Sequence, residues 1–200
     1  FNQRGDTIYN QTPIISNQKI KNTHLEGVMK GKGYVKDGTV IEESMDFSEK
    51  NYASTEALNQ ILKRIIFPKQ FSKNEQFKIE QEDYFFLRYW MSRTPNEVTI
   101  PFYDRETFFD SYGKFFIYGD KKGEMTNTTR IYNKVGLAYG TTTDVAYVKD
   151  RNGIEFFLTA TILTNKNEIF NDNKYEYDQL GIPFLAALGR EIYQFEKNKN

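Results

Sequence analysis

The residues best suited to chemistry lie around one lysine in the last third of the 200-residue chain. Lys134 is followed two positions later by Gly136, and Tyr139, Gly140 and Asp144 come shortly after it. A lysine at the opening of a strand, with a glycine beside it, offers a point positive charge next to accessible backbone. That combination suits recognition of a substrate carboxylate or modulation of a nearby proton transfer. The same pattern also fits a solvated strand-end lysine beside a turn glycine.

Three successive β-strands are predicted to position this lysine. Residues 129–134 form a short mixed segment, 141–149 are rich in Thr, Val and Tyr, and 154–163 are a nearly continuous apolar run. The pair Asn152-Gly153 predicts a tight hairpin between the last two strands. We therefore expect an α+β fold with an antiparallel three-stranded sheet. A C-terminal helix is expected to cross one face of that sheet through an apolar stripe, Leu185, Leu188, Ile192 and Phe195.

The order of residues in this region resembles the lysine–threonine–glycine strand of class A β-lactamases and penicillin-binding-protein-like serine hydrolases. In that family the motif is followed by Tyr-Gly-Thr and then by an Asp two residues before an Ala. The matching residues here are Lys134, Gly136, Tyr139, Gly140, Thr141, Asp144 and Ala146. Val135 stands where the family has its Thr, so that hydroxyl is absent.

Three further segments are similar to a Bacteroidota-type group of serine-hydrolase-like proteins in the same superfamily. They read S-M-D-F-S at 44–48, N-D-N-K-Y-E-Y-D at 171–178 and P-F-L-A-A-L-G-R at 183–190. With them the likeness extends over about residues 31–197.

The resemblance implies acyl transfer, in which a serine attacks an amide or lactam carbonyl and backbone N–H groups stabilise the oxyanion. Lys134 would be the catalytic lysine, and one oxyanion donor would lie near Leu137–Ala138. The substrate-binding set that the resemblance implies is Asn133, Val135, Gly136, Leu137, Ala138 and Tyr139. The expected substrate is a small molecule or peptidoglycan-like, reached through an upstream half, and no cofactor or metal is expected.

The chain offers no convincing nucleophile for that chemistry. Ser16 and Lys19 formally match Ser-x-x-Lys, but the residues after Lys19 are too polar for the buried helix that the motif needs. The separation from Lys134 also leaves too little room for the helical domain that the family places between the two motifs. His24, the only histidine, has no Ser or Asp arranged for a triad. Because the chain also begins at Phe1 without a methionine, we expect it to be the C-terminal part of a longer serine-hydrolase-like domain, inactive alone.

Composition narrows the function classes further. Zero net charge gives no reason to expect a nucleic-acid partner. The absence of cysteine excludes disulfides and thiolate chemistry, and no apolar run is long enough for a membrane span. The segment Gly27–Gly33 lacks the spacing of a phosphate-binding loop and predicts a turn or hairpin instead. Under the resemblance, we expect an extracytoplasmic location, periplasmic or membrane-anchored through a missing N-terminal segment.

The expected organisation is a single domain, or the C-terminal part of one, in three stretches. Residues 1–50 are irregular with a short hairpin, 51–120 are helical, and 128–200 hold the sheet and the last helix. Within the helical stretch, one helix follows an N-cap at Ser54 and stops before Pro68. A second is expected over about 81–91 and a third over about 105–118.

Two alternatives to an enzyme remain open. The first is a catalytically silent binding or scaffold domain with the same fold, which Val135 favours. The second is a carbohydrate-binding module that uses aromatic side chains. Phe85, Phe86, Tyr89 and Trp90 widen the apolar face of the second helix so far that we expect either deep burial or a partner surface. Nothing in the sequence predicts the oligomeric state.

Overall fold

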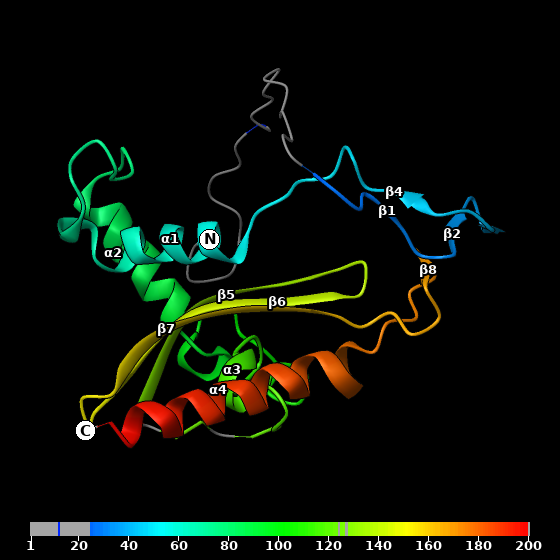
Figure 1. Cartoon of the computed structure of the whole chain (residues 1–200). Helices are drawn as coiled ribbons and strands as arrows, with labels where there is room; N and C mark the ends of the chain where they lie inside the picture. Colours follow the sequence, from blue (N-terminus) through cyan, green and yellow to red (C-terminus); the bar gives the residue numbers. More distant parts are fainter. Residues whose placement is uncertain (1–11, 13–24, 124, 127, 200) are drawn as a thin grey trace.

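The computed structural model describes residue 12 and residues 25–199, except 124 and 127. A three-stranded sheet forms the middle layer, with α1 (Thr55–Ile66) and α2 (Gln81–Ser92) against one face. The long C-terminal helix α4 (Ile182–Lys197) and the short α3 (Phe115–Tyr118) lie on the other face (Figure 1). The chain is thus an α+β fold, and the expected antiparallel sheet with its C-terminal helix is confirmed.

The sheet has the order β5-β6-β7, with both pairs antiparallel. Its strands are β5 (Thr129–Ala138), β6 (Thr141–Asp150) and β7 (Glu155–Leu163). The first strand continues four residues past its predicted end at Lys134. Lys134 therefore lies in the middle of the strand, where it pairs with Val145. The central strand is buried along most of its length, as its β-branched and aromatic residues predict.

Helix α1 covers the middle of the first face, next to α2. Its N-terminus is capped as the sequence predicts, since the Ser54 hydroxyl accepts a hydrogen bond from the N–H of Ala57 at 3.0 Å. Leu62 and Ile66 are buried against Val145 and Tyr147 of the sheet. Pro68 opens a single 3₁₀ turn (Pro68–Gln70) directly after the helix ends.

The second face carries the larger core. Seven buried residues form it, Phe115, Phe116, Ile117, Ile131, Ala146, Val148 and Leu185. Gly189 of α4 lies directly against the Phe116–Ile117 backbone, where a Cβ would meet the Ile117 nitrogen at 2.6 Å. The predicted stripe on α4 was wrong at one position. Phe195 is 59% exposed, because the buried face of the helix runs through Leu185, Ala186 and Gly189 instead.

The predicted helix over 105–118 does not form. A series of turns occupies this stretch, and only Phe115–Tyr118 is assigned as helical. Even there Phe116 and Ile117 have non-helical dihedrals, with φ of 73° at Ile117. Gly113 also has a positive φ (74°), and this geometry turns the following lysine inward.

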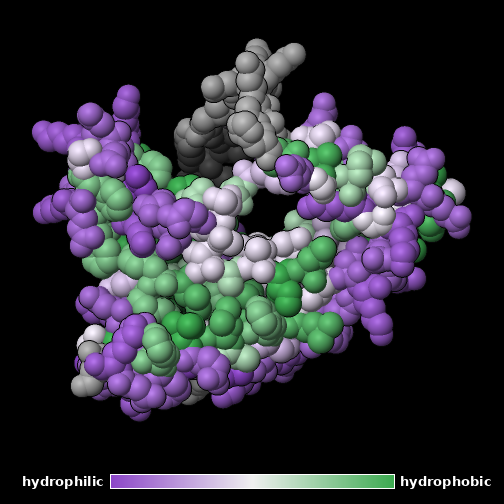
Figure 2. Space-filling view, viewed as in Figure 1, coloured by the Kyte–Doolittle hydropathy of each residue, from purple (hydrophilic) through white to green (hydrophobic). Residues whose placement is uncertain are grey.

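Two small sheets form an arm beside the β5–β6 turn. One pairs β1 (Met29–Lys30) with β4 (Met45–Asp46), and the other has the order β3-β2-β8. Its strands are β2 (Gly33–Lys36), β3 (Thr39–Ile41) and β8 (Ile169–Phe170). The hairpin at Asp37–Gly38 is confirmed, with both residues at positive φ. Figure 2 shows an opening between this arm and the sheet.

Phe47 attaches the arm to the sheet. Its ring packs edge-on against Tyr139 at 5.2 Å and Phe170 at 4.9 Å between centroids. None of the helices in the described part of the chain is long and apolar enough to cross a membrane.

Candidate functional site

The predicted site residues are divided between the two faces of β5. Side chains alternate along a strand, so Lys134 and Gly136 share the face that α1 and α2 partly cover. Lys134 is exposed there, and its ammonium donates to the carbonyl of Val135 at 2.7 Å. A Cβ added at Gly136 would meet nothing within 4 Å. Among the residues that the structure describes, none therefore covers this part of the strand.

The outer edge of β5 carries unused backbone donors. The carbonyls of Ile131 and Val135 accept bonds from lysine side chains, so the backbone groups of these residues point away from β6. Leu137, two residues after Val135, has the same orientation because backbone groups alternate along a strand. Within the described residues, the N–H groups of Val135 and Leu137 have no hydrogen-bond partner. An incoming carbonyl or oxyanion can therefore bind at this edge.

A cavity of about 520 Å³ adjoins this edge. Val135 and Leu137 form one wall, and Ile182 and Pro183 at the start of α4 form another. Tyr112, the other lining residues of the 109–122 segment and Asp178 complete it. Its volume lies within the usual range for small-molecule sites. Free backbone donors and a mostly apolar cavity thus occur side by side.

A buried lysine lies beneath this cavity. Lys114 is only 4% exposed, and its ammonium has three acceptors. These are the carbonyl oxygens of Met91 at 2.7 Å and Ile131 at 2.9 Å, and the Oδ1 atom of Asn133 at 2.8 Å. An ammonium has three hydrogens, so every donor of Lys114 is used.

Asn133 links this lysine to a buried carboxylate. Its Nδ2 atom donates to the two carboxylate oxygens of Asp144 at 2.9 and 3.1 Å and to the carbonyl of Gly113 at 2.8 Å. Asp144 is fully buried and also accepts from the N–H of Phe116 at 3.3 Å. We call Lys114, Asn133 and Asp144 the buried triad. It ties β5 and β6 to the irregular segment that lines the cavity.

Burial shifts both charged members of the buried triad toward their neutral forms. Loss of water raises the pKa of Asp144 to about 6, although hydrogen bonds from Asn133 and Phe116 oppose the shift. Loss of water likewise lowers the pKa of Lys114 to about 8, and the nearby Asp144 charge opposes it. The triad has no direct opening to the cavity through Lys114, whose donors are all taken. Its arrangement positions the strand rather than contacting a substrate.

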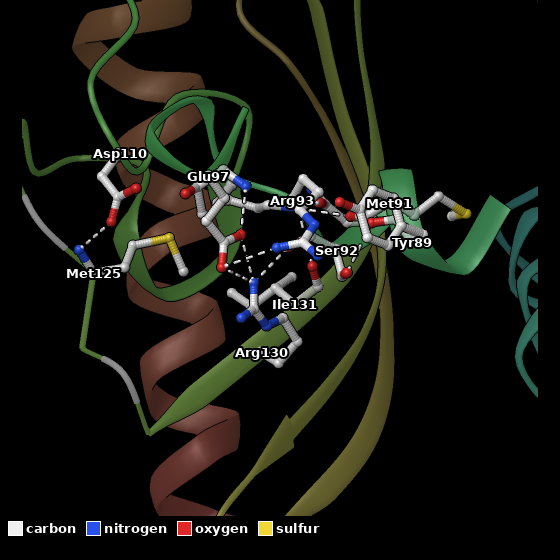
Figure 3. A network of polar contacts seen from close by, with 12 residues as sticks. Tyr89, Met91, Ser92, Arg93, Glu97, Asp110, Met125, Arg130 and Ile131 are labelled. Carbon is white, nitrogen blue, oxygen red and sulfur yellow. Dashed lines mark hydrogen bonds and ion pairs between the residues drawn. The ribbon is translucent and has the colours of Figure 1, made fainter. Parts of the chain in front are cut away.

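A second polar network fixes the end of α2 to β5 (Figure 3). The guanidinium of Arg130 donates to both carboxylate oxygens of Glu97 at 2.8 and 2.6 Å and to the carbonyl of Ser92 at 3.2 Å. Arg93 approaches the same carboxylate at 3.6 Å. Partial burial by itself raises the pKa of Glu97, but bonds from Arg130 and the Thr94 N–H bring it below its ordinary value. A polar cavity of about 310 Å³ adjoins the network.

The structure places the remaining predicted residues as follows. Asn133 lies on the opposite face from Lys134 and belongs to the buried triad. Ala138 is exposed at the end of β5. Tyr139 lies in the β5–β6 turn at a φ of 52°, and its ring packs against the arm rather than along the strand edge. Ser16, Lys19 and His24 lie outside the described residues.

Sequence reasoning missed Lys114. The signal was present, because it is a single charge inside the aromatic run Y-G-K-F-F, where a solvated lysine is unexpected. In the described part of the chain, no group of three or more His, Cys, Asp or Glu side chains is arranged to hold a metal ion.

No protein-family model, no curated protein and no solved structure matches this chain. The fold and the strand-edge geometry therefore carry the functional inference.

Proposed function

We propose that this chain supplies the substrate-binding strand of a serine-hydrolase-like acyl-transfer domain of the β-lactamase/transpeptidase type. The observation that carries the proposal is the outward N–H of Leu137, which has no partner among the described residues and lies three positions after an exposed lysine. A cavity of about 520 Å³ adjoins that donor. The nucleophilic serine would come from a segment upstream of Phe1 in a longer protein.

The roles in this proposal follow from charge and position. The serine oxygen attacks the carbonyl carbon while its proton passes to a general base on the same upstream segment, and the carbonyl π-electrons move onto oxygen. The C–N bond then breaks, and the leaving nitrogen takes up that proton. The Leu137 N–H stabilises that oxyanion, as a fixed donor that needs no rearrangement during the reaction. The Lys134 ammonium binds a substrate carboxylate. Gly136 lies on the same face as Lys134, opposite to the cavity, and leaves room beside the lysine for the substrate carboxylate.

A binding experiment tests the proposal on the chain itself. We expect an acylated D-alanyl-D-alanine peptide or a penicillin to shift the amide NMR signal of Leu137 in the ¹⁵N-labelled chain. Lys134→Ala should weaken binding ten- to a hundredfold, since it removes a charge-assisted contact worth about 1.5–3 kcal/mol. Lys36→Ala, at an exposed lysine of β2, is the matched control and should bind as the wild type.

A second pair of variants isolates the backbone donor. Leu137→Pro removes the N–H, whereas Leu137→Ala keeps it and changes only the side chain. Proline is tolerated at an edge strand where the N–H makes no ladder bond. The proline variant should therefore fold but bind more weakly than the alanine variant. Equal affinities for the two variants, or no shift at Leu137 with either ligand, would refute the acyl-transfer role.

A catalytically silent scaffold of the same fold is the second candidate. It is favoured by Val135, which puts no hydroxyl at the strand edge, and by the bond from Lys134 to the neighbouring backbone. If the chain is such a scaffold, Lys134→Ala leaves the affinity for both ligands unchanged. The buried triad then contributes only to the stability of the fold.

A further inference from the structure

The outward face of α2 is an exposed aromatic surface. Phe85 is 65% exposed, Phe86 59%, Tyr89 38% and Trp90 45%. On the opposite side of the helix, Tyr84 is buried. The sequence left deep burial and a partner surface open for these rings, and their exposure excludes deep burial within the chain. Monomeric proteins seldom leave such a contiguous group of large rings in water.

Two of the three neighbouring ring pairs are packed edge to face. Phe86 and Trp90 have an interplanar angle of 62° and Tyr89 and Trp90 have 85°, whereas Phe85 and Tyr89 are tilted by 32°. A sugar or a base stacks on a flat ring face, which this arrangement does not offer across the group. Aromatic ridges with an adjacent arginine are typical of protein–protein contacts instead.

The order of residues on this face is self-complementary. Four positions spaced at i, i+4, i+7 and i+11 lie along its centre, Glu82, Phe86, Tyr89 and Arg93. The stripe therefore has an acid at its N-terminal end, a base at its C-terminal end and aromatic rings between them. Arg93 caps the helix with its guanidinium 4.0 Å from the centre of the Tyr89 ring and 3.6 Å from Glu97, and its side chain is 28% exposed, so a partner's carboxylate would meet a cation that is already held in place. The charged ends are about 16 Å apart at 1.5 Å per residue.

An antiparallel second copy of α2 matches every position of this stripe. With the two-fold axis between Leu87 and Arg88, Glu82 faces Arg93 of the partner subunit. The same register sets Phe86 opposite Tyr89 of the partner subunit. Phe85 then faces Trp90 of the partner subunit. One register thus pairs both opposite charges and all the exposed rings.

The four exposed rings of α2 form an aromatic ridge, and a hollow lies beside it. A cavity of about 390 Å³ lies between α2 and the sheet, lined by Phe85 and Tyr89 together with Phe67, Tyr132 and Tyr147. A two-fold interface needs a projection and a recess on the same surface, because each subunit presents both. Phe86 and Trp90 project from the helix, and the cavity can receive an aromatic side chain.

The exposed rings are large enough to matter energetically. At about 150–250 Å² for each aromatic side chain, the exposed parts of the four sum to about 400 Å². A standard interface buries about 800 Å² on each partner, so the rings supply about half and the polar rim the rest.

We propose that two copies of this chain associate through α2 as an antiparallel, two-fold symmetric pair, with the aromatic ridge at the centre and Glu82–Arg93 ion pairs at both ends. This inference is independent of the acyl-transfer proposal, because Lys134, Gly136 and Leu137 take no part in it.

Sedimentation velocity over a range of concentrations tests the association. The wild type should sediment as a dimer at high concentration and dissociate on dilution. Trp90 is the only tryptophan of the chain, so its emission should move to the red as the dimer dissociates. A wild-type chain that stays monomeric at every concentration, with unchanged Trp90 emission, overturns the proposal.

Charge exchange tests the register. Glu82→Arg and Arg93→Glu should each weaken dimerisation at least tenfold, because like charges then meet at both ends. Mixing the two variants should restore a dimer that contains one of each. Glu97→Gln controls for the contact between Arg93 and Glu97 within one chain and should leave dimerisation intact. Phe102→Ser, at a ring that is 78% exposed and off α2, should also leave it intact.

Circular dichroism tests whether each variant folds. If a charge variant does not fold, Phe86→Ser replaces it as the variant that should weaken dimerisation. A dimer that persists in Phe86→Ser, or a failure of the mixed charge variants to pair, shows that the contact lies elsewhere or involves another partner.

Discussion

Replacing Asn133 by alanine should destabilise the fold severely, although the residue carries no charge. Its amide accepts one hydrogen bond from Lys114 at 2.8 Å and donates to Asp144 at 2.9 and 3.1 Å. Both ionisable partners are at most 4% exposed, so water cannot replace the lost bonds. Each buried bond to a charged group contributes about 1.5–3 kcal/mol. Breaking a buried charge network typically costs about 3–5 kcal/mol, which is the loss that we expect.

Urea unfolding followed by circular dichroism at neutral pH measures this loss. The slope of free energy against urea should stay unchanged, since the surface exposed on unfolding is the same. Lys134→Ala is the matched control, because that side chain is exposed on the next position of the strand, and it should change stability by less than about 0.5 kcal/mol. A loss below about 1 kcal/mol for Asn133→Ala would refute the reasoning, because the triad would then contribute little to the fold.

Two further predictions concern the same core. Between about pH 4 and 6, Asp144 binds more protons in the native state than in the unfolded state, so the free energy of unfolding falls as pH rises; we call this fall the acid limb. Between about pH 8 and 10.4, Lys114 binds more protons in the unfolded state, so the free energy of unfolding rises with pH. Asp144→Asn should abolish the acid limb in urea midpoints measured across this range, and an unchanged limb would assign it to other groups. Gly189→Ala should cost about 1–3 kcal/mol, because its Cβ would meet the Ile117 nitrogen at 2.6 Å, whereas Gly136→Ala has open space and should be close to neutral in the same unfolding assay.

The sequence predicted those elements that are determined by local patterns. The Ser54 cap, the Asp37–Gly38 turn and the three strands each follow from residues adjacent in the chain. Lys134 was expected where a strand opens, whereas it lies in the middle of β5 and pairs with Val145. The free donor at Leu137 also depends on that strand's having no outer neighbour among the described residues.

The failures arise where distant contacts outweigh local periodicity. Aromatic residues at helical spacing predicted a helix over 105–118, but Lys114 turns inward to the carbonyls of Met91 and Ile131 and the backbone follows it. No local pattern shows that those acceptors lie close by. The predicted burial of Phe195 was wrong for a related reason. The close approach of Gly189 to the Phe116–Ile117 backbone sets the rotation of α4 and leaves the Phe195 ring exposed.

The parallel pairing of β2 with β8 governs the order in which this molecule can assemble. Gly33 pairs with Ile169 and Tyr34 with Phe170, so the two strands are separated by more than 130 positions of chain. A ribosome releases β2 long before β8 exists, and the β2–β3 hairpin alone is at best marginally stable in water. Joining its third strand requires closing a long loop, whose entropic cost the β5–β6–β7 hairpins avoid. The main sheet is therefore expected to form first, and the arm is completed only after the chain has passed Phe170.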